Sequence, residues 1–445
     1  MLTDKQKDLV LAVERHIWAN PETGFREVKT TAYLLNIFRD LGYEPVEASG
    51  ITGFYADLDT GRPGPTIAVM GEMDSLIVRD HPEADPVTGA VHACGHHAQC
   101  ATLVGVAAAM RNPGALDGLC GKIRFMAVPA EELIELEFRE NLRAQGIIEF
   151  FGGKMEFVRR GYFDGVDMSM LIHTGKASEG KYLSINQGNI GCVVKQAIFT
   201  GKSAHAGGAP HQGVNALYAA TTAINAANAL RETFTGSGHV RYHPIITEGG
   251  TAVNAIPERV TIESYVRGLN MDVLRRYNRA INRAMAASAA AIGARVKLID
   301  RIGYFPLNNC RELGDVMEEA MTELAGEGSV LRSNGRAYGS SDAGDISTLM
   351  PIVHPKSTGA AGTSHGADYR IVDPYAACVM TAECMVIALG KLLANEGVRA
   401  RAIKAAYKPI FASKEEYYAA AAEFRLDLDA VTEQEDGSII LQYMH

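Results

Sequence analysis

The stretch VHACGHHAQC, residues 91–100, organises the chain, because it places Cys94, His96 and His97 next to one another. An apolar run, residues 101–110, follows directly and predicts a helix. A thiolate and an imidazole at this spacing can reach one metal ion, and the N-terminal amides of the helix would point to the same place. A buried cysteine packed beside structural histidines is the alternative that these ten residues leave open.

The composition is that of an ordinary globular protein, with 47% hydrophobic and 21% charged residues among 445. This length exceeds the usual limit of one hydrophobic core and predicts two domains. The net charge of -9 argues against nucleic acid or an anionic membrane as the main partner. Seven scattered cysteines without a secretory signal predict reduced thiols and a cytoplasmic protein. Residues 376–394 are apolar but contain Glu383 and Lys391, which fits a core helix better than a membrane span.

Three short apolar runs, each followed by polar side chains, predict buried strands. They are TIAVMG (66–71), IRFMAV (123–128) and DMSMLI (167–172), with helical patterns between them. This order predicts an α/β fold with a mostly parallel sheet and helices on both faces. Asp74, the Glu131-Glu132 pair and His173 follow the three runs, at the sheet edge where open α/β sheets bind ligands.

The pattern changes near residue 190. Strand-like segments at 192–200, 240–247, 259–267 and 295–299 alternate with helical runs at 214–234 and 273–291. Their order, β-α-β-β-α-β, is that of a ferredoxin-like unit. We therefore predict an inserted α+β domain at 188–303, within a catalytic domain formed by 1–187 and 304–445. The tail from 398 to 445 mixes helix-like and polar pieces and receives no assignment.

Seven ordered motifs resemble those of the dinuclear-metal amidohydrolase, aminoacylase and carboxypeptidase family of metallopeptidases. They are VHACGHHAQCATLVG (91–105), AVPAEE (127–132), LIHTG (171–175), GKSAHAGGAPHQGVNAL (201–217), GGTAVNAIPERV (249–260) with YVRG (265–268), GSSDAGDIS (339–347) and TSHGA (363–367). Within the family, GSSDAGDIS and the segment GEMDSL (71–76) resemble the aminobenzoyl-glutamate utilisation hydrolases and their dipeptidase relatives.

The resemblance implies a role for each matching residue. The implied ligands of two divalent ions, zinc or manganese, are Cys94, His96 as the bridging group, Glu132, His173 and His365. Glu131 would act as the general base, and Asp74 would orient a ligand. His205, on the inserted dimerisation domain, would reach the active site of the partner in a homodimer and hold the tetrahedral oxyanion. Asn254 and Arg267 would contact a substrate carboxylate, for which arginine supplies a planar fork.

These roles predict an amidohydrolase, because two divalent ions can polarise an amide carbonyl and activate water. The expected substrate is an N-acyl or N-aroyl amino acid, similar to aminobenzoyl-glutamate, from which a free amino acid is released. A dipeptidase acting on unusual small dipeptides shares the same motifs and is the alternative. A metal-binding subunit without catalysis is less favoured, because it has no need of Glu131. A structural zinc protein is also less favoured, because its ligands would lie closer together in sequence.

Three features depart from the family pattern. Glu72 stands where carboxypeptidase-type relatives carry a metal-binding histidine, so whether Glu72 binds metal stays open. Residues 133–151 form an insertion close to the Glu131-Glu132 pair that is expected to shape the acyl pocket. His97 stands where the family often has aspartate, and we expect it to pack at the helix start, as we do for His92 and Cys100.

Overall fold

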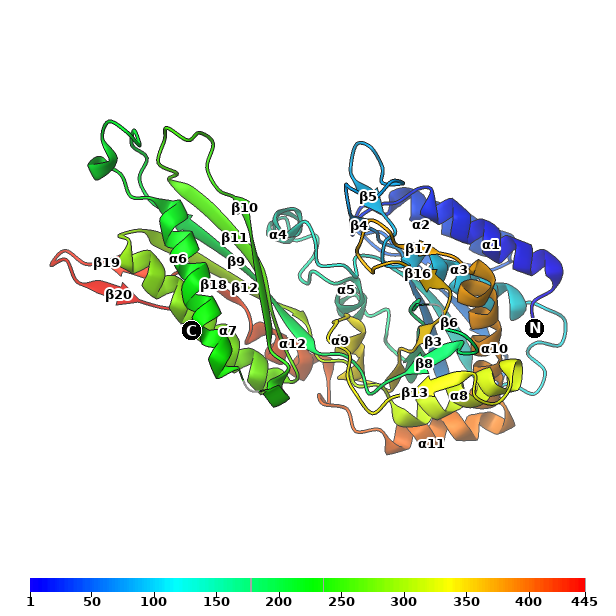
Figure 1. The fold of residues 1–445 in the computed structure, drawn as a ribbon. Coiled ribbons are helices and arrows are strands. Elements are labelled where there is room, and N and C mark those ends of the chain that lie inside the picture. Colours follow the sequence, from blue (N-terminus) through cyan, green and yellow to red (C-terminus); the bar gives the residue numbers. More distant parts are fainter. Residues whose placement is uncertain (177, 235, 445) are drawn as a thin grey trace. The chain divides into compact units, whose positions relative to one another are not determined.

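The computed structural model describes residues 1–176, 178–234 and 236–444 (Figure 1). The chain divides into two compact units. The first unit comprises Met1–Gly188, Leu307–Ala337 and Ser341–Ala412. The second comprises Asn189–Pro306, Tyr338–Ser340 and Ser413–His445.

A six-stranded sheet forms the centre of the first unit, in the order β1-β2-β6-β3-β7-β14. Its strands are β1 (Val46–Glu47), β2 (Phe54–Asp59), β3 (Thr66–Glu72), β6 (Lys122–Val128), β7 (Met168–Met170) and β14 (Ile352–Val353). Strands β6, β3, β7 and β14 are parallel, whereas β1 and β2 are antiparallel. Six of the seven residues of β3 are buried, as in a strand covered on both faces. The predicted α/β fold with a mostly parallel sheet is confirmed.

Helices surround this sheet and bury an extensive apolar core. They include α1 (Asp4–Trp18), α2 (Val28–Asp40), α3 (His96–Ala109), α5 (Gly153–Arg159), α8 (Arg311–Ala325), α9 (Ala343–Ser347), α10 (Thr381–Leu393) and α11 (Val398–Ala406). Every residue of α3 is buried, because most of the helix is apolar or small, and its polar residues, including His96, His97 and Gln99, lie in the first two turns. The helical stretch Tyr375–Leu393 is long and apolar enough to cross a membrane, but 72% of its most apolar window is buried inside the protein, as in a core helix.

Short strands shape the loops beside the central sheet. β4 (Leu76–Ile77) pairs with β5 (Ala90–Val91), and β16 (Ala360–Ala361) pairs with β17 (Arg370–Ile371). β8 (Leu183–Ile185) pairs with both β13 (Val330–Arg332) and β15 (Lys356–Ser357). The predicted insertion contains a helix of its own, α4 (Leu136–Ala144).

A five-stranded antiparallel sheet forms the second unit, in the order β10-β11-β9-β12-β18. Its elements are β9 (Gly191–Thr200), α6 (Ala216–Ala229), β10 (Arg241–Glu248), β11 (Arg259–Gly268), α7 (Met271–Ala291), β12 (Arg295–Tyr304), α12 (Lys414–Ala422) and β18 (Leu426–Asp429). The first six follow the predicted β-α-β-β-α-β order, so the ferredoxin-like inserted domain is confirmed. Asn215 and Asn270 cap α6 and α7, because each side chain accepts a backbone hydrogen bond from the first helical turn.

The C-terminal tail lies with the second unit, although we expected all of 304–445 to belong to the catalytic domain. Strand β18 pairs with the edge of β12, and β19 (Val431–Glu433) forms a hairpin with β20 (Ile439–Leu441) that contacts α7. The alternation of Leu426 and Leu428 with exposed aspartates suits an edge strand.

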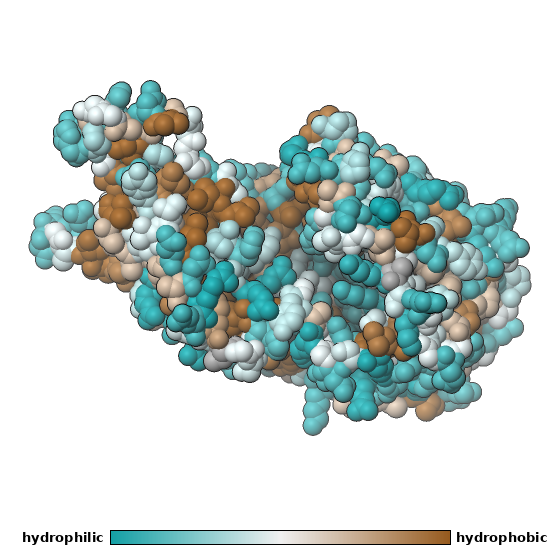
Figure 2. All heavy atoms as spheres, viewed as in Figure 1, coloured by the Kyte–Doolittle hydropathy of each residue, from teal (hydrophilic) through white to brown (hydrophobic). Residues whose placement is uncertain are grey.

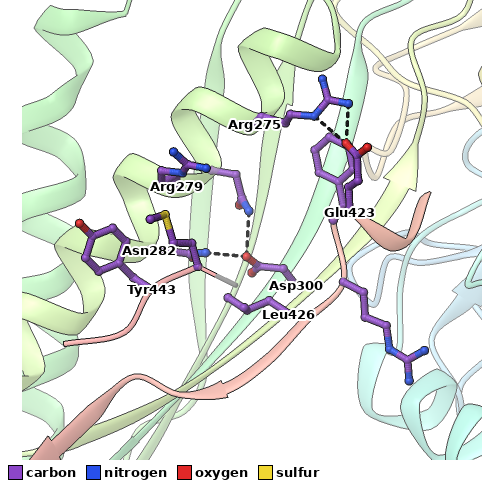
Figure 3. Close-up of a pocket in the computed structure, with 11 residues that line it drawn as sticks. Arg275, Arg279, Asn282, Asp300, Glu423, Leu426 and Tyr443 are labelled. Atoms are coloured by element: carbon purple, nitrogen blue, oxygen red, sulfur yellow. Dashed lines mark hydrogen bonds and ion pairs between the residues drawn. The ribbon is translucent and has the colours of Figure 1, made fainter. Parts of the chain in front are cut away.

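A buried polar network lies between α7 and β12 in the second unit (Figure 3). Lys195 forms an ion pair with Asp300, and both side chains are almost completely buried. Asp300 also accepts hydrogen bonds from Asn278 at 2.8 Å and from Asn282 at 2.7 Å. These bonds satisfy a charge that would otherwise be costly to bury.

Candidate metal centre

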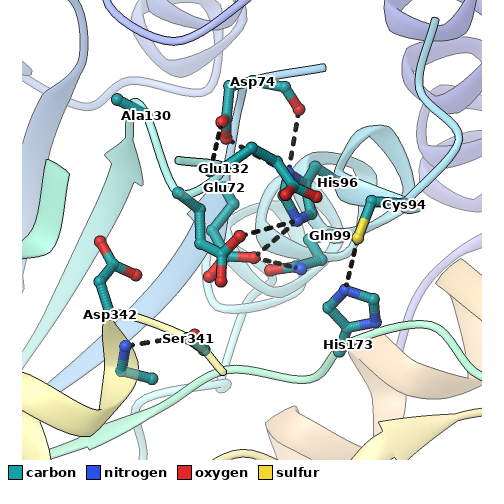
Figure 4. Close-up of polar contacts among 12 residues, drawn as sticks. Glu72, Asp74, Cys94, His96, Gln99, Ala130, Glu132, His173, Ser341 and Asp342 are labelled. Atoms are coloured by element: carbon teal, nitrogen blue, oxygen red, sulfur yellow. Dashed lines mark hydrogen bonds and ion pairs between the residues drawn. The ribbon is translucent and has the colours of Figure 1, made fainter. Parts of the chain in front are cut away.

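The structure brings the five predicted ligands together from distant segments. Figure 4 shows four of them, Cys94, His96, Glu132 and His173. Cys94 follows β5, His96 begins α3, Glu132 follows β6, His173 follows β7, and His365 lies between β16 and β17. Cys94 Sγ lies 3.3 Å from His173 Nε2, and His365 Nε2 lies 3.3 Å from Glu132 Oε1. Their donor atoms fall within 4.8 Å of one another in groups of three, the spacing that a single ion requires.

Two of these groups share one thiol. The first is Cys94, His96 and His173, and the second is Cys94, Glu132 and His365. His96, which we expected to bridge, has its Nδ1 2.9 Å from the Asp74 carbonyl oxygen and offers only Nε2 to the cluster. A thiolate sulfur carries several lone pairs and can contact two ions. His96 likewise belongs to two groups, because it also lies with Glu131 and Glu132, so its bridging role stays a prediction beside that of Cys94.

The buried donor atoms of this cluster suit metal ions. His96 Nε2 lies 3.2 Å from Glu72 Oε2, and Glu132 Oε1 lies 3.3 Å from His365 Nε2. These ion-pair contacts join groups that each bind divalent cations. His173 Nδ1 lies 2.7 Å from the Thr174 carbonyl oxygen, so its Nε2 is left for the cluster. Thiolate, imidazole and carboxylate donors suit zinc and neighbouring divalent ions.

The charges in the cluster also match metal binding. Burial and Glu132 act to raise the pKa of Cys94, but His173 and His96 outweigh them and lower it to about 6. Burial likewise opposes ionisation of Glu132, yet the hydrogen bond and charge of His365 lower its pKa to about 2. The pKa of His365 rises to about 11 despite burial, because Cys94 and Glu132 surround the ring. Thiolate and carboxylate are the ionised forms that bind metal.

Asp74 contacts two of the predicted ligands. Its Oδ2 accepts a hydrogen bond from the Glu132 backbone N–H at 2.8 Å, and its Oδ1 lies 3.2 Å from His96 Nδ1. The carboxylate is completely buried. This position is compatible with the predicted role in orienting a ligand.

Glu131 lies beside the cluster. Its Oε2 is 3.8 Å from His96 Nε2, and its side chain is 9% exposed. Burial, together with the Glu72 and Glu132 carboxylates, raises its pKa well above the ordinary value. A carboxyl with a raised pKa can take up and return a proton near neutral pH.

A buried charge network that the sequence did not predict borders the cluster. Lys154 Nζ lies 2.5 Å from both Glu72 Oε1 and Asp342 Oδ1, and all three side chains are completely buried. Gln99 Nε2 donates to Glu72 Oε2 at 2.6 Å, and His96 Nε2 lies 3.2 Å from the same oxygen. Both carboxylate oxygens of Glu72 therefore already have polar partners.

His354 is a second residue to which the sequence assigned no role. It directly follows β14, and its ring centroid lies 5.9 Å from that of His173. Both ring nitrogens are buried and have no hydrogen-bond partner in the described part of the chain. Burial is the main reason that its pKa is lowered to about 3. Its signal was the same as for His173, a histidine after a short apolar strand.

The remaining side chains of the opening stretch point away from the donor groups. His97 Nε2 lies 3.3 Å from Glu14 Oε1, and its ring lies 5.0 Å from that of Trp18. His92 packs against His97, with ring centroids 5.3 Å apart. The Cys100 thiol donates to the Glu72 carbonyl oxygen at 2.9 Å. These contacts agree with the packing roles expected from the sequence.

Three predicted residues lie in the second unit. His205 is exposed, and its Nδ1 accepts hydrogen bonds from the backbone N–H groups of Gly207 at 3.1 Å and Gly208 at 2.8 Å. This arrangement places the ring proton on Nε2, which is then a donor. Asn254 is adjacent, because Ala206 N donates to its carbonyl oxygen at 2.9 Å.

Arg267 lies at the opposite end of the same sheet. It stands near the end of β11, which begins at Arg259 after the Asn254 loop, so the strand separates the two by roughly 25 Å. Its Nη1 donates to Ser340 Oγ at 3.2 Å. The structure therefore brings His205 and Asn254 together but not Arg267.

Comparisons with known proteins agree with this architecture. The family model for the M20 peptidase dimerisation domain matches residues 185–292. The indole-3-acetyl-aspartic acid hydrolase of Enterobacter agglomerans is 31% identical over 56% of this chain and 55% of its own length. The N-acyl-L-amino acid amidohydrolase of Geobacillus stearothermophilus is 28% identical over 70% of this chain and 80% of its own length.

Solved structures share the fold. A dinuclear metal-binding peptidase of the M20 family from Bacillus subtilis covers 87% of this chain and 98% of its own, with a TM-score of 0.62 and 19% identity. An aminobenzoyl-glutamate utilization protein from Klebsiella pneumoniae covers 87% and 96%, with a TM-score of 0.64 and 21% identity. The resemblance inferred from the seven motifs is confirmed.

Proposed function

We propose that this chain, which shares the fold of the M20 peptidases and matches their dimerisation domain, is a dinuclear-metal amidohydrolase acting on an N-acyl or N-aroyl amino acid. The observation that carries this proposal is the convergence of five metal donors beside Glu131. Two relatives support the substrate class, because each is named for an acylated amino acid. The seven cysteines are buried free thiols, which is compatible with a cytoplasmic enzyme.

Five residues would hold the two ions, which we take to be zinc or manganese. Cys94, His96 and His173 form one candidate ligand group, and Cys94, Glu132 and His365 form another. When bound, the two ions would polarise the scissile carbonyl and lower the pKa of the attacking water.

Glu131 would move the proton. Its carboxylate would accept a proton from the attacking water and return it to the leaving amine, so that the amino acid departs neutral at nitrogen. Its burial next to Glu72 and Glu132 supports this role, since both effects favour the protonated form that the second step requires.

His205 would stabilise the oxyanion from the partner subunit of a homodimer, with Asn254 beside it. Its Nε2–H is fixed by two backbone donors to Nδ1 and is free to donate outward. Arg267 lies roughly 25 Å away along β11, too far to share a small substrate with His205 of the same subunit. One substrate would therefore meet Arg267 of one subunit and His205 of the other.

The surface of the second unit supports the homodimer. β10 is an edge strand of the five-stranded sheet and exposes Ile245 and Ile246, which are 53% and 39% exposed. Tyr218 on α6 is 64% exposed, and Figure 2 shows apolar residues gathered over the region of α6 and β10. An apolar surface beside an open strand edge is suited to pairing with a second copy.

The test is a substrate panel of N-acyl amino acids, N-aroyl amino acids and dipeptides, with zinc or manganese. Glu131→Gln should lower kcat by about a thousandfold or more while metal content and KM stay close to wild type. Glu137→Gln, an exposed position of α4, is the control and should be fully active. Near-normal turnover by Glu131→Gln would refute the general-base role. If the wild type hydrolysed dipeptides but no N-acyl or N-aroyl amino acid, the proposed substrate class would be wrong and the enzyme would be a dipeptidase.

Subunit complementation tests the shared site. Glu131→Gln and His205→Ala should each be inactive, but each mixed dimer would contain one intact site, so random mixing should restore about a quarter of wild-type activity. If His205 acted within its own subunit, every site in the mixture would carry a defect and no activity would return.

A further inference from the structure

The insertion 133–151 contributes an arginine that contacts the backbone of the Glu131-Glu132 pair. Arg139 belongs to α4 and is only 1% exposed. Its Nη2 donates to the Glu132 carbonyl oxygen, and its Nη1 donates to the Phe151 carbonyl oxygen at 2.7 Å. The guanidinium thus joins the segment that carries the Glu pair to the end of the insertion.

This guanidinium has no carboxylate partner in the described part of the chain, and its Nε has no hydrogen bond. Burying a cation without a counter-ion is costly, and most buried arginines are paired. The surroundings are nevertheless shaped to hold it. A Cβ on Gly24 would come within 2.5 Å of Nη2, and the Phe25 ring lies 5.6 Å from the guanidinium carbon.

Three ionisable side chains fix the backbone of the Glu pair from different sides. Glu27 accepts a hydrogen bond from Ala130 N–H at 2.8 Å, and Asp74 accepts one from Glu132 N–H at 2.8 Å. Arg139 supplies the matching donor to the Glu132 carbonyl oxygen, which also accepts from Ile134 N–H at 3.0 Å. The turn needs this support, because Ala130 has a φ of 54°, which is unfavourable for a residue other than glycine.

We propose that Arg139 is a positioning residue that fixes the peptide plane after Glu132 and thereby aims the Glu131 and Glu132 carboxylates. The proposal rests on the proposed function, since it assigns Glu132 to the metal and Glu131 to proton transfer. A planar guanidinium donates to the two carbonyl oxygens through two separate nitrogens, whereas the single nitrogen of an ammonium would have to lie within reach of both oxygens, and a thioether donates to neither. The insertion therefore serves the catalytic segment directly, through its buried face.

The experiment compares wild type with Arg139→Met, Arg139→Lys and a control, Arg143→Met, each loaded with Co²⁺. Arg143 lies one turn further along α4, and its guanidinium forms ion pairs with Glu140 and Glu149, at 3.5 and 3.7 Å. The readouts are bound cobalt per chain, the visible absorption of the bound cobalt, kcat, KM and the unfolding midpoint.

Arg139→Met should lower kcat by about 10- to 100-fold with KM within about threefold of wild type, as for other residues that orient a metal ligand. Its cobalt bands should shift, because the Glu132 carboxylate is displaced while the Cys94 thiolate stays bound. Arg139→Lys should recover part of kcat, and Arg143→Met should match wild type in both kcat and spectrum.

Two outcomes would overturn the proposal. In the first, Arg139→Met or Arg139→Lys lowers the unfolding midpoint but leaves kcat per bound cobalt and the cobalt spectrum as in the wild type. Arg139 would then stabilise the fold without positioning the Glu131 and Glu132 carboxylates. In the second, the wild type binds no cobalt. This result would refute both the role of Arg139 and the proposed function. A wild type that binds cobalt but hydrolyses no substrate would end only the proposed function, and the spectra would then decide the role of Arg139.

Discussion

Replacing Gly95 by alanine should destabilise the candidate metal centre, because there is no room for a side chain at this position. Gly95 lies between Cys94 and His96 and forms the N-cap of α3 with a φ of 97°. A Cβ at this position would come closer than 3.0 Å to both Thr174 Oγ1 and Tyr369 Oη. These two oxygens are hydrogen-bonded to each other at 3.0 Å, so at least one side chain must move.

The structure gives the size of the effect in two parts. An alanine held at positive φ costs about 1–2 kcal/mol. Displacing Thr174 or Tyr369 breaks their hydrogen bond and leaves a buried polar group unsatisfied, which adds about 1–3 kcal/mol. The expected loss in the free energy of unfolding is therefore about 2–5 kcal/mol. Gly42→Ala is the matched control, because Gly42 has a φ of 80° and no atom would lie within 4 Å of its Cβ.

Urea unfolding followed by tryptophan fluorescence measures this loss. Trp18 is the only tryptophan, and its ring lies 5.0 Å from that of His97, one residue beyond the metal donor His96. Gly95→Ala should unfold at clearly lower urea than Gly42→Ala, and adding Thr174→Ala should recover part of the difference. If Gly95→Ala cost no more than Gly42→Ala, the steric reasoning would be refuted.

Further predictions concern buried charges. Lys154→Met should cost about 3–5 kcal/mol in urea unfolding, because it leaves Glu72 and Asp342 buried without their cation, and adding Asp342→Asn should restore part of that loss. Burial, with Asp74 nearby, raises the pKa of Glu27 from 4.5 to about 8, so the folded state holds a proton that the unfolded state releases. The unfolding free energy of the metal-free protein should therefore fall as pH rises from about 4.5 to 8, and Glu27→Gln should flatten that slope; an unchanged slope would contradict the assignment. In the second unit, Asp300→Ala should lower the calorimetric transition strongly by leaving Lys195 unpaired, whereas Glu423→Ala, which breaks an exposed pair with Arg275, should change stability by less than about 1 kcal/mol.

The donors of the metal centre could be predicted because local signals located them. Apolar runs at 66–71 and 123–128 matched β3 and β6 to within one residue, and the polar side chains that matter follow directly after them. Parallel strands end at one edge of a sheet, so residues after successive strands meet whatever their separation in sequence. The Glu131-Glu132 pair and His173 were found in this way.

The features that were missed depend on contacts between segments without a local pattern. Lys154 follows Gly152 and Gly153 at the start of α5, and nothing in that segment indicates that its ammonium lies between Glu72 and Asp342. His354 follows β14 much as His173 follows β7, but none of the seven motifs includes it, so the motifs gave no reason to single it out. β18 was missed because its place beside β12 is decided by an open sheet edge more than 120 residues earlier in the chain.

Lys154 bears on whether Glu72 binds metal. Glu72, Glu131 and Asp342 have oxygens within 4.8 Å of one another and by position alone resemble a cation site. The ammonium of Lys154 lies between two of these carboxylates, and together with His96 it outweighs burial and lowers the pKa of Glu72. The donors around Cys94 contact one another instead, with His365 Nε2 3.3 Å from Glu132 Oε1 and His173 Nε2 3.3 Å from Cys94 Sγ. Lys154 thus satisfies one set of carboxylates, and the donors around Cys94 are the set that we propose for the metal ions.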